Sequence, residues 1–119
     1  MFHVTCTIES YGFGHIVIDG KRYTSDVIIF PDRVKDGWWR KEGHKLHIED
    51  IEEVLREKPE ILIVGTGYAG LMKVPKEVQE HIRNQGIELI IENTRNAWKT
   101  YNKLAKTGKK VIAAFHLTC

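Results

Sequence analysis

Uninterrupted apolar runs in the second half of the chain predict the strands at the centre of the fold. Residues 61–64 and 111–115 are apolar throughout, and 87–91 form a third mainly apolar stretch. Runs without polar alternation are typical of strands covered on both faces. We therefore expect a central sheet that is buried on both sides.

In the first thirty residues, apolar and polar positions alternate and turn residues are frequent, which predicts antiparallel strands. Apolar and polar residues alternate from Phe2 to Ile8, and Tyr11 to Gly14 is expected to end this first strand. Asp19-Gly20, between the segments 15–18 and 21–24, predicts a hairpin because Asp-Gly favours the positive φ angles of a tight turn. Residues 27–30 predict another strand, which ends at Pro31-Asp32.

Residues 33–45 show no periodicity and are predicted to form a long loop. Helical spacing of apolar residues then predicts helices over 48–58, 75–85 and 94–107. The order of strand 61–64, helix 75–85 and strand 87–91 predicts a βαβ unit with parallel strands, extended by the last helix and strand to βαβαβ. The α/β fold should therefore hold a mixed sheet, with part of the N-terminal hairpin region as an additional antiparallel β layer.

Composition narrows the class of protein. A chain of 119 residues with 42% hydrophobic and 29% charged residues fits one globular domain, assigned here to residues 1–119. No apolar run approaches the roughly 18 residues of a membrane span, and the first residues do not resemble a secretion or organelle leader, so a cytoplasmic location is expected. A net charge of +2 does not predict nucleic-acid binding.

Two Cys/His pairs have the composition of a zinc site that would join the two ends of the chain. His3 and Cys6, like His116 and Cys119, are three residues apart. On a strand such residues point to opposite faces, so neither pair can clamp one metal ion while its segment stays extended. We therefore predict no metal and no cofactor.

The glycine-rich segment after strand 61–64 is the candidate ligand site. Because the carboxyl ends of parallel strands share one edge of a sheet, it should lie beside the residues that follow strand 87–91. The residues expected to line the crevice are Gly65, Thr66, Gly67, Tyr68, Glu92, Asn93, Thr94 and Arg95. Three interpretations stay open: a dinucleotide, another small ligand or anion, or a purely structural turn with Thr94 capping a helix.

The dinucleotide interpretation rests on the pattern Gly65-x-Gly67-x-x-Gly70, with Glu92 placed to bind a ribose. Against it, residues 71–75 delay the next helix, whose N-terminal amides should meet the pyrophosphate. No nucleophile paired with a base stands out in this set. His44 and His47, near Asp50, either form such a base with its orienting group or contact a helix N-terminus.

Trp38 and Trp39 form a separate candidate site. Two adjacent tryptophans on a charged loop cannot both be buried if the segment is extended, so one of them is a candidate interface anchor. The basic side chains Arg95, Lys99, Lys103 and Lys106 share the polar face of the last helix. They are interpreted as solvated because no exposed aromatic residue is interleaved with them.

The order of several motifs resembles a known family. The motifs are Asp26, Pro31-Asp32, Trp38 to His44, Asp50, Gly65-Thr66-Gly67, and Asn93 to Ala97 with Tyr101-Asn102. Together they resemble the small α/β domain shared by adipogenesis-associated domain proteins and mitochondrial complex I assembly factor 3, with this chain as a stand-alone prokaryotic member. The resemblance implies three layers around a central mixed sheet and a small added β layer. It implies no reaction, and the eukaryotic members act as assembly or regulatory factors.

Two functional hypotheses follow. The first is a non-enzymatic domain that acts through protein contact, by self-association or as an assembly factor, and uses Trp38 and Trp39. The second is a small-molecule or anion binding protein, or an enzyme, with its site at the Gly65-Thr66-Gly67 loop. The sequence names neither the ligand nor the partner.

Overall fold

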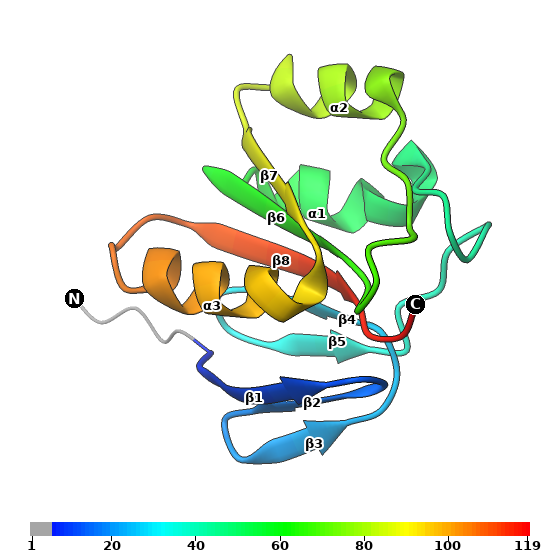
Figure 1. The fold of residues 1–119 in the computed structure, drawn as a ribbon. Helices are drawn as coiled ribbons and strands as arrows, with labels where there is room; N and C mark the ends of the chain where they lie inside the picture. Colours follow the sequence, from blue (N-terminus) through cyan, green and yellow to red (C-terminus); the bar gives the residue numbers. More distant parts are fainter. Residues whose placement is uncertain (1–5) are drawn as a thin grey trace.

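The computed structural model describes residues 6–119, which form two β-sheets and a set of short helices (Figure 1). The smaller sheet consists of β1 (Ile8–Gly12), β2 (His15–Ile18) and β3 (Lys21–Tyr23), and the larger sheet consists of β4 (Val27–Ile29), β5 (Val34–Asp36), β6 (Ile61–Thr66), β7 (Glu88–Glu92) and β8 (Val111–His116). The helices are a 3₁₀ turn at Ile48–Ile51, α1 (Glu52–Glu57), α2 (Lys76–Arg83) and α3 (Thr94–Ala105). Across residues 6–119, no helix has the length and apolar character needed to cross a bilayer.

The five-stranded sheet is mixed, with the order β5-β4-β8-β6-β7. β6 pairs in parallel with both β7 and β8. β4 pairs antiparallel with β8 on one side and with β5 on the other. The predicted parallel βαβαβ half and the mixed sheet are therefore confirmed.

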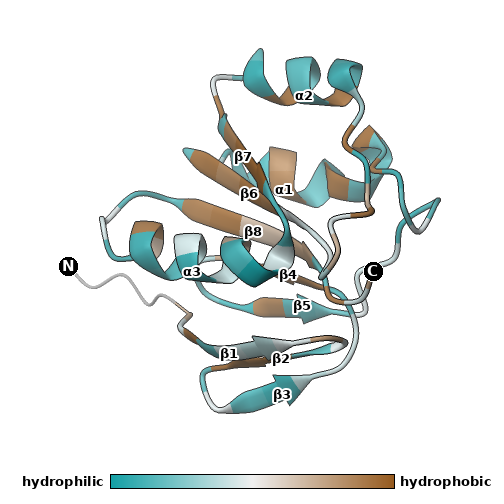
Figure 2. Ribbon diagram, in the orientation of Figure 1, coloured by the Kyte–Doolittle hydropathy of each residue, from teal (hydrophilic) through white to brown (hydrophobic). Residues whose placement is uncertain are grey.

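Both faces of the central sheet are covered, as the uninterrupted apolar runs predict. In β6, Ile61 and Ile63 point into a core shared with α3 and the three-stranded sheet, and Leu62 and Val64 point into a second core against α1 and α2. Figure 2 shows hydrophobic residues concentrated on the central strands, with hydrophilic residues on much of α2 and α3. Successive side chains of the same strands therefore point to opposite faces, and each set packs against one of the two outer layers.

The N-terminal β layer is a three-stranded antiparallel sheet. The Asp19-Gly20 turn is confirmed, with both residues at positive φ. The predicted break over Tyr11 to Gly14 is narrower in the structure, because β1 continues to Gly12 and the turn lies at Phe13-Gly14. Tyr11 stays in the strand because it pairs with Ile16 and its hydroxyl donates to the Leu117 carbonyl at 2.7 Å. The first part of the predicted strand 2–8 lies outside the described residues.

The predicted loop over residues 33–45 also requires a correction. Its first part is β5, which folds back on β4 after the turn at Pro31-Asp32. The Phe30 N–H donates to the Arg33 carbonyl at 2.8 Å and closes this turn. A strand of three residues is too short to show a hydrophobic period, so only its pairing with β4 identifies it.

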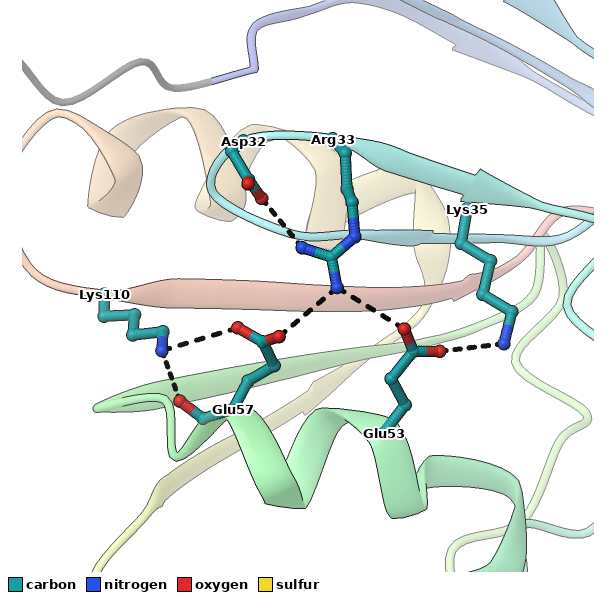
Figure 3. A network of polar contacts seen from close by, with 6 residues as sticks. All are labelled: Asp32, Arg33, Lys35, Glu53, Glu57 and Lys110. Atoms are coloured by element: carbon teal, nitrogen blue, oxygen red, sulfur yellow. Dashed lines mark hydrogen bonds and ion pairs between the residues drawn. The ribbon is translucent and has the colours of Figure 1, made fainter.

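A network of ion pairs joins this hairpin to α1 and to the start of β8 (Figure 3). Arg33 contacts Glu53 at 3.4 Å and Glu57 at 3.3 Å. Lys35 lies 2.9 Å from the other oxygen of Glu53, and Lys110 lies 3.6 Å from Glu57. Arg33 and Lys35 are 42% and 49% exposed at their side chains, so salt in the solvent should screen the network.

We expect Arg33→Gln to lower the thermal midpoint at low ionic strength, because Arg33 joins two carboxylates of α1. The difference from wild type should shrink as sodium chloride is raised toward 1 M, where the Debye length falls to about 3 Å. Differential scanning fluorimetry across a salt series measures it. Lys109→Gln, at an exposed lysine without an ion pair in the described structure, is the control. A deficit that does not depend on salt would contradict the electrostatic explanation.

Candidate functional site

The loops after β6 and β7 lie together, as the topology predicts. The Gly67 carbonyl accepts a hydrogen bond from the Thr94 N–H at 2.9 Å. The Thr94 hydroxyl accepts from the Gly67 N–H at 2.9 Å and donates to the His116 carbonyl at 2.7 Å. This fully buried hydroxyl therefore links the ends of β6 and β8 to the start of α3.

Two glycines permit this close approach of backbones. A Cβ atom on Gly65 would lie 2.7 Å from Phe115 Cδ1 and 2.8 Å from Thr94 Oγ1. Gly67 has a φ of +106°, and a Cβ atom there would lie 2.3 Å from the Cys119 carbonyl carbon. Only glycine fits at a left-handed position with so little space.

The last residues of the chain run along the glycine loop, near the end marked C in Figure 1. The Tyr68 N–H donates to the Thr118 carbonyl at 2.7 Å, and the Leu71 N–H donates to the Cys119 backbone oxygen at 3.0 Å. Together with the Gly67 N–H, these amides are occupied by partners within the protein. The ligand role of the crevice stays a prediction, and the interactions present in it are internal.

The remaining predicted site residues also have partners. Thr66 donates from its hydroxyl to the Glu92 carbonyl at 3.2 Å, and the Glu92 carboxylate accepts from Thr100 at 2.7 Å. Arg95 donates from Nε to the Tyr68 carbonyl at 2.9 Å and lies over the Tyr68 ring. The predicted helix cap is displaced by one residue: Asn93, not Thr94, is the N-cap of α3, because its side chain accepts from the Asn96 N–H.

The helix after the glycine-rich segment, α2, begins only at Lys76, which is the delayed start that argues against the dinucleotide interpretation. Of the two Cys/His pairs, His3 lies outside the described residues. The Cys6 thiol donates to the Phe30 carbonyl at 3.6 Å, and burial raises its pKa to about 11. Cys6 is therefore a protonated thiol at neutral pH.

A buried polar cluster of Asp26, Arg40 and His116 lies at the end of β8, and the spacing of the residues did not predict it. His116 Nδ1 lies 2.8 Å from Asp26 Oδ2, and the Leu117 N–H donates to Asp26 Oδ1 at 2.7 Å. Arg40 Nη1 lies 2.8 Å from Asp26 Oδ2, and Arg40 Nη2 donates to the Gly43 carbonyl at 3.0 Å. The side chains of Arg40 and His116 are only 5% and 7% exposed.

His116 Nδ1 contacts two charged groups. Asp26 Oδ2, which can only accept a hydrogen bond, lies 2.8 Å away, and Arg40 Nη2, which can only donate one, lies 3.0 Å away. His116 Nε2 is buried and has no hydrogen-bond partner within the described structure. A histidine oriented by a carboxylate can act as a base, but no hydroxyl or thiol of residues 6–119 bonds to this nitrogen.

Asp26 remains ionised in this cluster. Burial raises the pKa of its carboxyl group, but hydrogen bonds from His116 and from the Leu117 N–H, with the charge of Arg40, outweigh burial and hold the pKa below its usual value. Asp26 and His116 are 90 residues apart, so no local pattern could reveal the contact. The available signal was the resemblance, whose motifs include Asp26 and Arg40.

The two tryptophans differ in exposure, in agreement with the prediction that both cannot be buried. Trp38 is 5% exposed, donates from Nε1 to the Asp50 carbonyl at 2.9 Å, and lies under the Arg40 guanidinium. Trp39 is 87% exposed. Beside it lies a pocket of about 320 Å³ whose lining includes Glu49, Glu52 and other charged residues of the 3₁₀ turn and α1.

His44 and His47 do not form a base with Asp50 as its orienting group. Asp50 Oδ2 accepts from the backbone N–H of His47 at 2.8 Å, at the start of the 3₁₀ turn. The His47 ring instead pairs with Glu42 at 2.7 Å. The His44 ring lies edge-on to His116, with ring centroids 5.7 Å apart.

Comparison with known proteins identifies a family for this fold. A family model described as "Protein of unknown function (DUF498/DUF598)" matches residues 8–116. The chain belongs to this family. It is 29% identical over 110 residues to the human NADH dehydrogenase (ubiquinone) 1 alpha subcomplex assembly factor 3; the match covers 90% of the chain and 58% of that relative.

Solved structures share the fold. A conserved hypothetical protein of Pyrococcus horikoshii is 31% identical, with a TM-score of 0.83 over 95% of this chain and 99% of the other. A protein of Bartonella henselae, described as an outer membrane protein, is 25% identical, with a TM-score of 0.82 over 100% of both chains. These similarities support the three-layer fold that the resemblance implied.

The close contacts of the glycine loop predict that Gly67→Ala destabilises the fold far more than the same substitution at a left-handed glycine with open space around it. We expect it to lower the free energy of unfolding by roughly 3 kcal/mol or more, from left-handed strain and overpacking against residue 119. Gly20→Ala is the matched control, because its φ is also positive, +79°, but its Cβ would meet open space. It should cost about 1 kcal/mol. Urea denaturation of both variants measures the difference, and equal losses would contradict the packing role.

The buried cluster predicts a pH-dependent role for Asp26. Asp26→Asn should lower the free energy of unfolding at pH 7 by about 3 kcal/mol, because it leaves Arg40 without its counter-charge. The folded pKa of Asp26 lies below its unfolded value, so its stabilisation is present above about pH 4 and is lost as pH falls through the folded pKa.

The difference between wild type and Asp26→Asn should therefore shrink in urea denaturation curves recorded from pH 7 down to acid. Asp36→Asn, at an exposed carboxylate, is the control and should show a much smaller difference. A difference for Asp26→Asn that stays constant with pH would show that its charge is not what stabilises the fold.

Proposed function

We propose that this chain is a protein-interaction domain of the assembly-factor type and that Trp39 is the central contact of its interface. The observation that carries the proposal is that Trp39 is 87% exposed, whereas the adjacent Trp38 is buried. Large aromatic side chains dominate binding energy when a partner covers them, whereas leaving one in water stabilises nothing.

The position of Trp39 supports the proposal. Trp38 is held by Asp50 and Arg40, so the segment that presents Trp39 is attached to a rigid core. Binding then needs little ordering of the main chain, which reduces the entropy cost of association. The similarity to an assembly factor supports the same class of function for this chain.

The charges around Trp39 would select the partner. The adjacent pocket is lined by the acidic residues Glu49, Asp50, Glu52 and Glu53 and by the basic residues Lys35 and Arg56. Two of these carboxylates are paired with lysines of the same chain, Glu49 with Lys41 at 3.4 Å and Glu53 with Lys35 at 2.9 Å. A partner that carries both acidic and basic residues at the rim of its interface fits this mixed surface best.

The proposal predicts that Trp39→Ala weakens binding without affecting the fold. The first measurement is analytical ultracentrifugation, which tells self-association from a monomer that needs another partner. For a monomer, a photo-crosslinking amino acid at position 39 captures the partner, and titration calorimetry with that partner should show at least about tenfold weaker binding for Trp39→Ala, as for an interface hot spot.

Phe13→Ala is the matched control, because Phe13 is a 59% exposed aromatic residue on the β1–β2 turn. It should leave binding unchanged. Trp38→Ala should instead lower the free energy of unfolding by roughly 3–5 kcal/mol, as expected for a buried aromatic side chain. Wild-type affinity in Trp39→Ala would remove Trp39 from the interface.

A further inference from the structure

A second pocket, of about 690 Å³, lies away from Trp39 between the segment that follows β6 and residues 44–45. Its volume is in the range of small-molecule sites. One part of the lining is basic, with Lys45, Lys73 and His44. The other part is apolar, with Leu71, Val74 and Pro75.

Backbone hydrogen bonds hold the two lysines side by side. The Lys73 N–H donates to the His44 carbonyl at 2.7 Å, and the Leu46 N–H donates to the Lys73 carbonyl at 2.9 Å. Lys45 and Lys73 form a parallel bridge between the two segments. Leu46 is fully buried next to Lys45, so the base of the pocket is anchored in the core and needs no rearrangement to receive a ligand.

Lys45 and Lys73 form no ion pair within the described structure, and no carboxylate side chain lines the pocket. Glu42, which bridges to Lys45 through the backbone, places its carboxylate on His47 at 2.7 Å. Both side chains are exposed, and an anion that contacts both ammonium groups would gain a favourable interaction with each.

The apolar part of the lining constrains the rest of the ligand. Leu71 is 52% exposed although its backbone N–H is fixed to Cys119. Exposed leucine beside a cationic rim suits a molecule with one charged end and an apolar body. We propose that this pocket binds a small organic anion, a phosphate or carboxylate on an apolar body, whose charged group contacts Lys45 and Lys73.

This site differs from the crevice predicted from the sequence. The crevice lies between the loops after β6 and β7, where the amides of Gly67 and Tyr68 already have partners. The pocket lies farther along the same segment, at Leu71 and Lys73, after the end of β6 at Thr66. The proposal is also independent of Trp39, so either can fail without the other.

The test is an NMR titration of the ¹⁵N-labelled full chain with phenyl phosphate and, in parallel, with benzoate. Saturable shifts at the amides of residues 44–46 and 70–74 are expected with at least one of the two, and their comparison identifies the preferred anionic group. Phenol and inorganic phosphate, which carry only the body or only the charge, should each bind at least tenfold more weakly.

Variants decide whether the lysines hold the anion. Lys45→Gln and Lys73→Gln should each weaken the binding by about tenfold, as expected for the loss of a charge-assisted contact. Lys103→Gln, at an exposed lysine on α3, should leave it unchanged. The proposal is overturned if neither phenyl phosphate nor benzoate gives saturable shifts in these residues, or if Lys103→Gln weakens binding as much as the pocket variants do.

Discussion

The Asp26 carboxylate is the constraint on which the arrangement of the loops depends. It bonds to His116 and to the Leu117 N–H at the end of β8, and it pairs with Arg40 from the segment that follows β5. Burying a carboxylate is costly unless charge and hydrogen bonds compensate it, and here both of its oxygens are engaged. Because the donors come from segments far apart in sequence, a single side chain sets the relative position of the start of β4, the end of β8 and the Trp38 segment.

The two candidate binding surfaces follow from this constraint. Arg40, fixed by Asp26, lies over the Trp38 ring at 4.7 Å and helps to hold that indole in the core. With Trp38 turned inward, the exposed Trp39 is presented from a rigid support. His116, fixed by the same carboxylate, supports the edge of the His44 ring. The interior cluster therefore connects the Trp39 surface with the cationic pocket, although neither surface includes Asp26.

Local patterns predicted what depends on local physics. The apolar runs 61–64 and 111–115, the Asp19-Gly20 turn and the helix spacings are set by neighbouring residues, and the structure confirms them. The end of β1 depends instead on Tyr11 reaching Leu117, 106 residues away, and β5 exists only through pairing with β4. The contacts of the Asp26 cluster are also long-range. The motifs of the resemblance therefore included Asp26 and Arg40 but did not show that the two residues are in contact.

The glycine loop shows why its place could be predicted from the sequence but its occupant could not. A glycine next to a ligand and a glycine next to the protein's own backbone look the same in a sequence, because both positions need a residue without a Cβ atom. Which case applies at Gly67 depends on the path of residues 118–119, and that path is set when the Leu117 N–H bonds to Asp26. With those residues against the loop, the cationic pocket is lined by later residues of the same segment, among them Leu71 and Lys73. The carboxylate that orders the interior thus also helps to fix which backbone lies against Gly67, while the ligand role of the crevice stays a prediction.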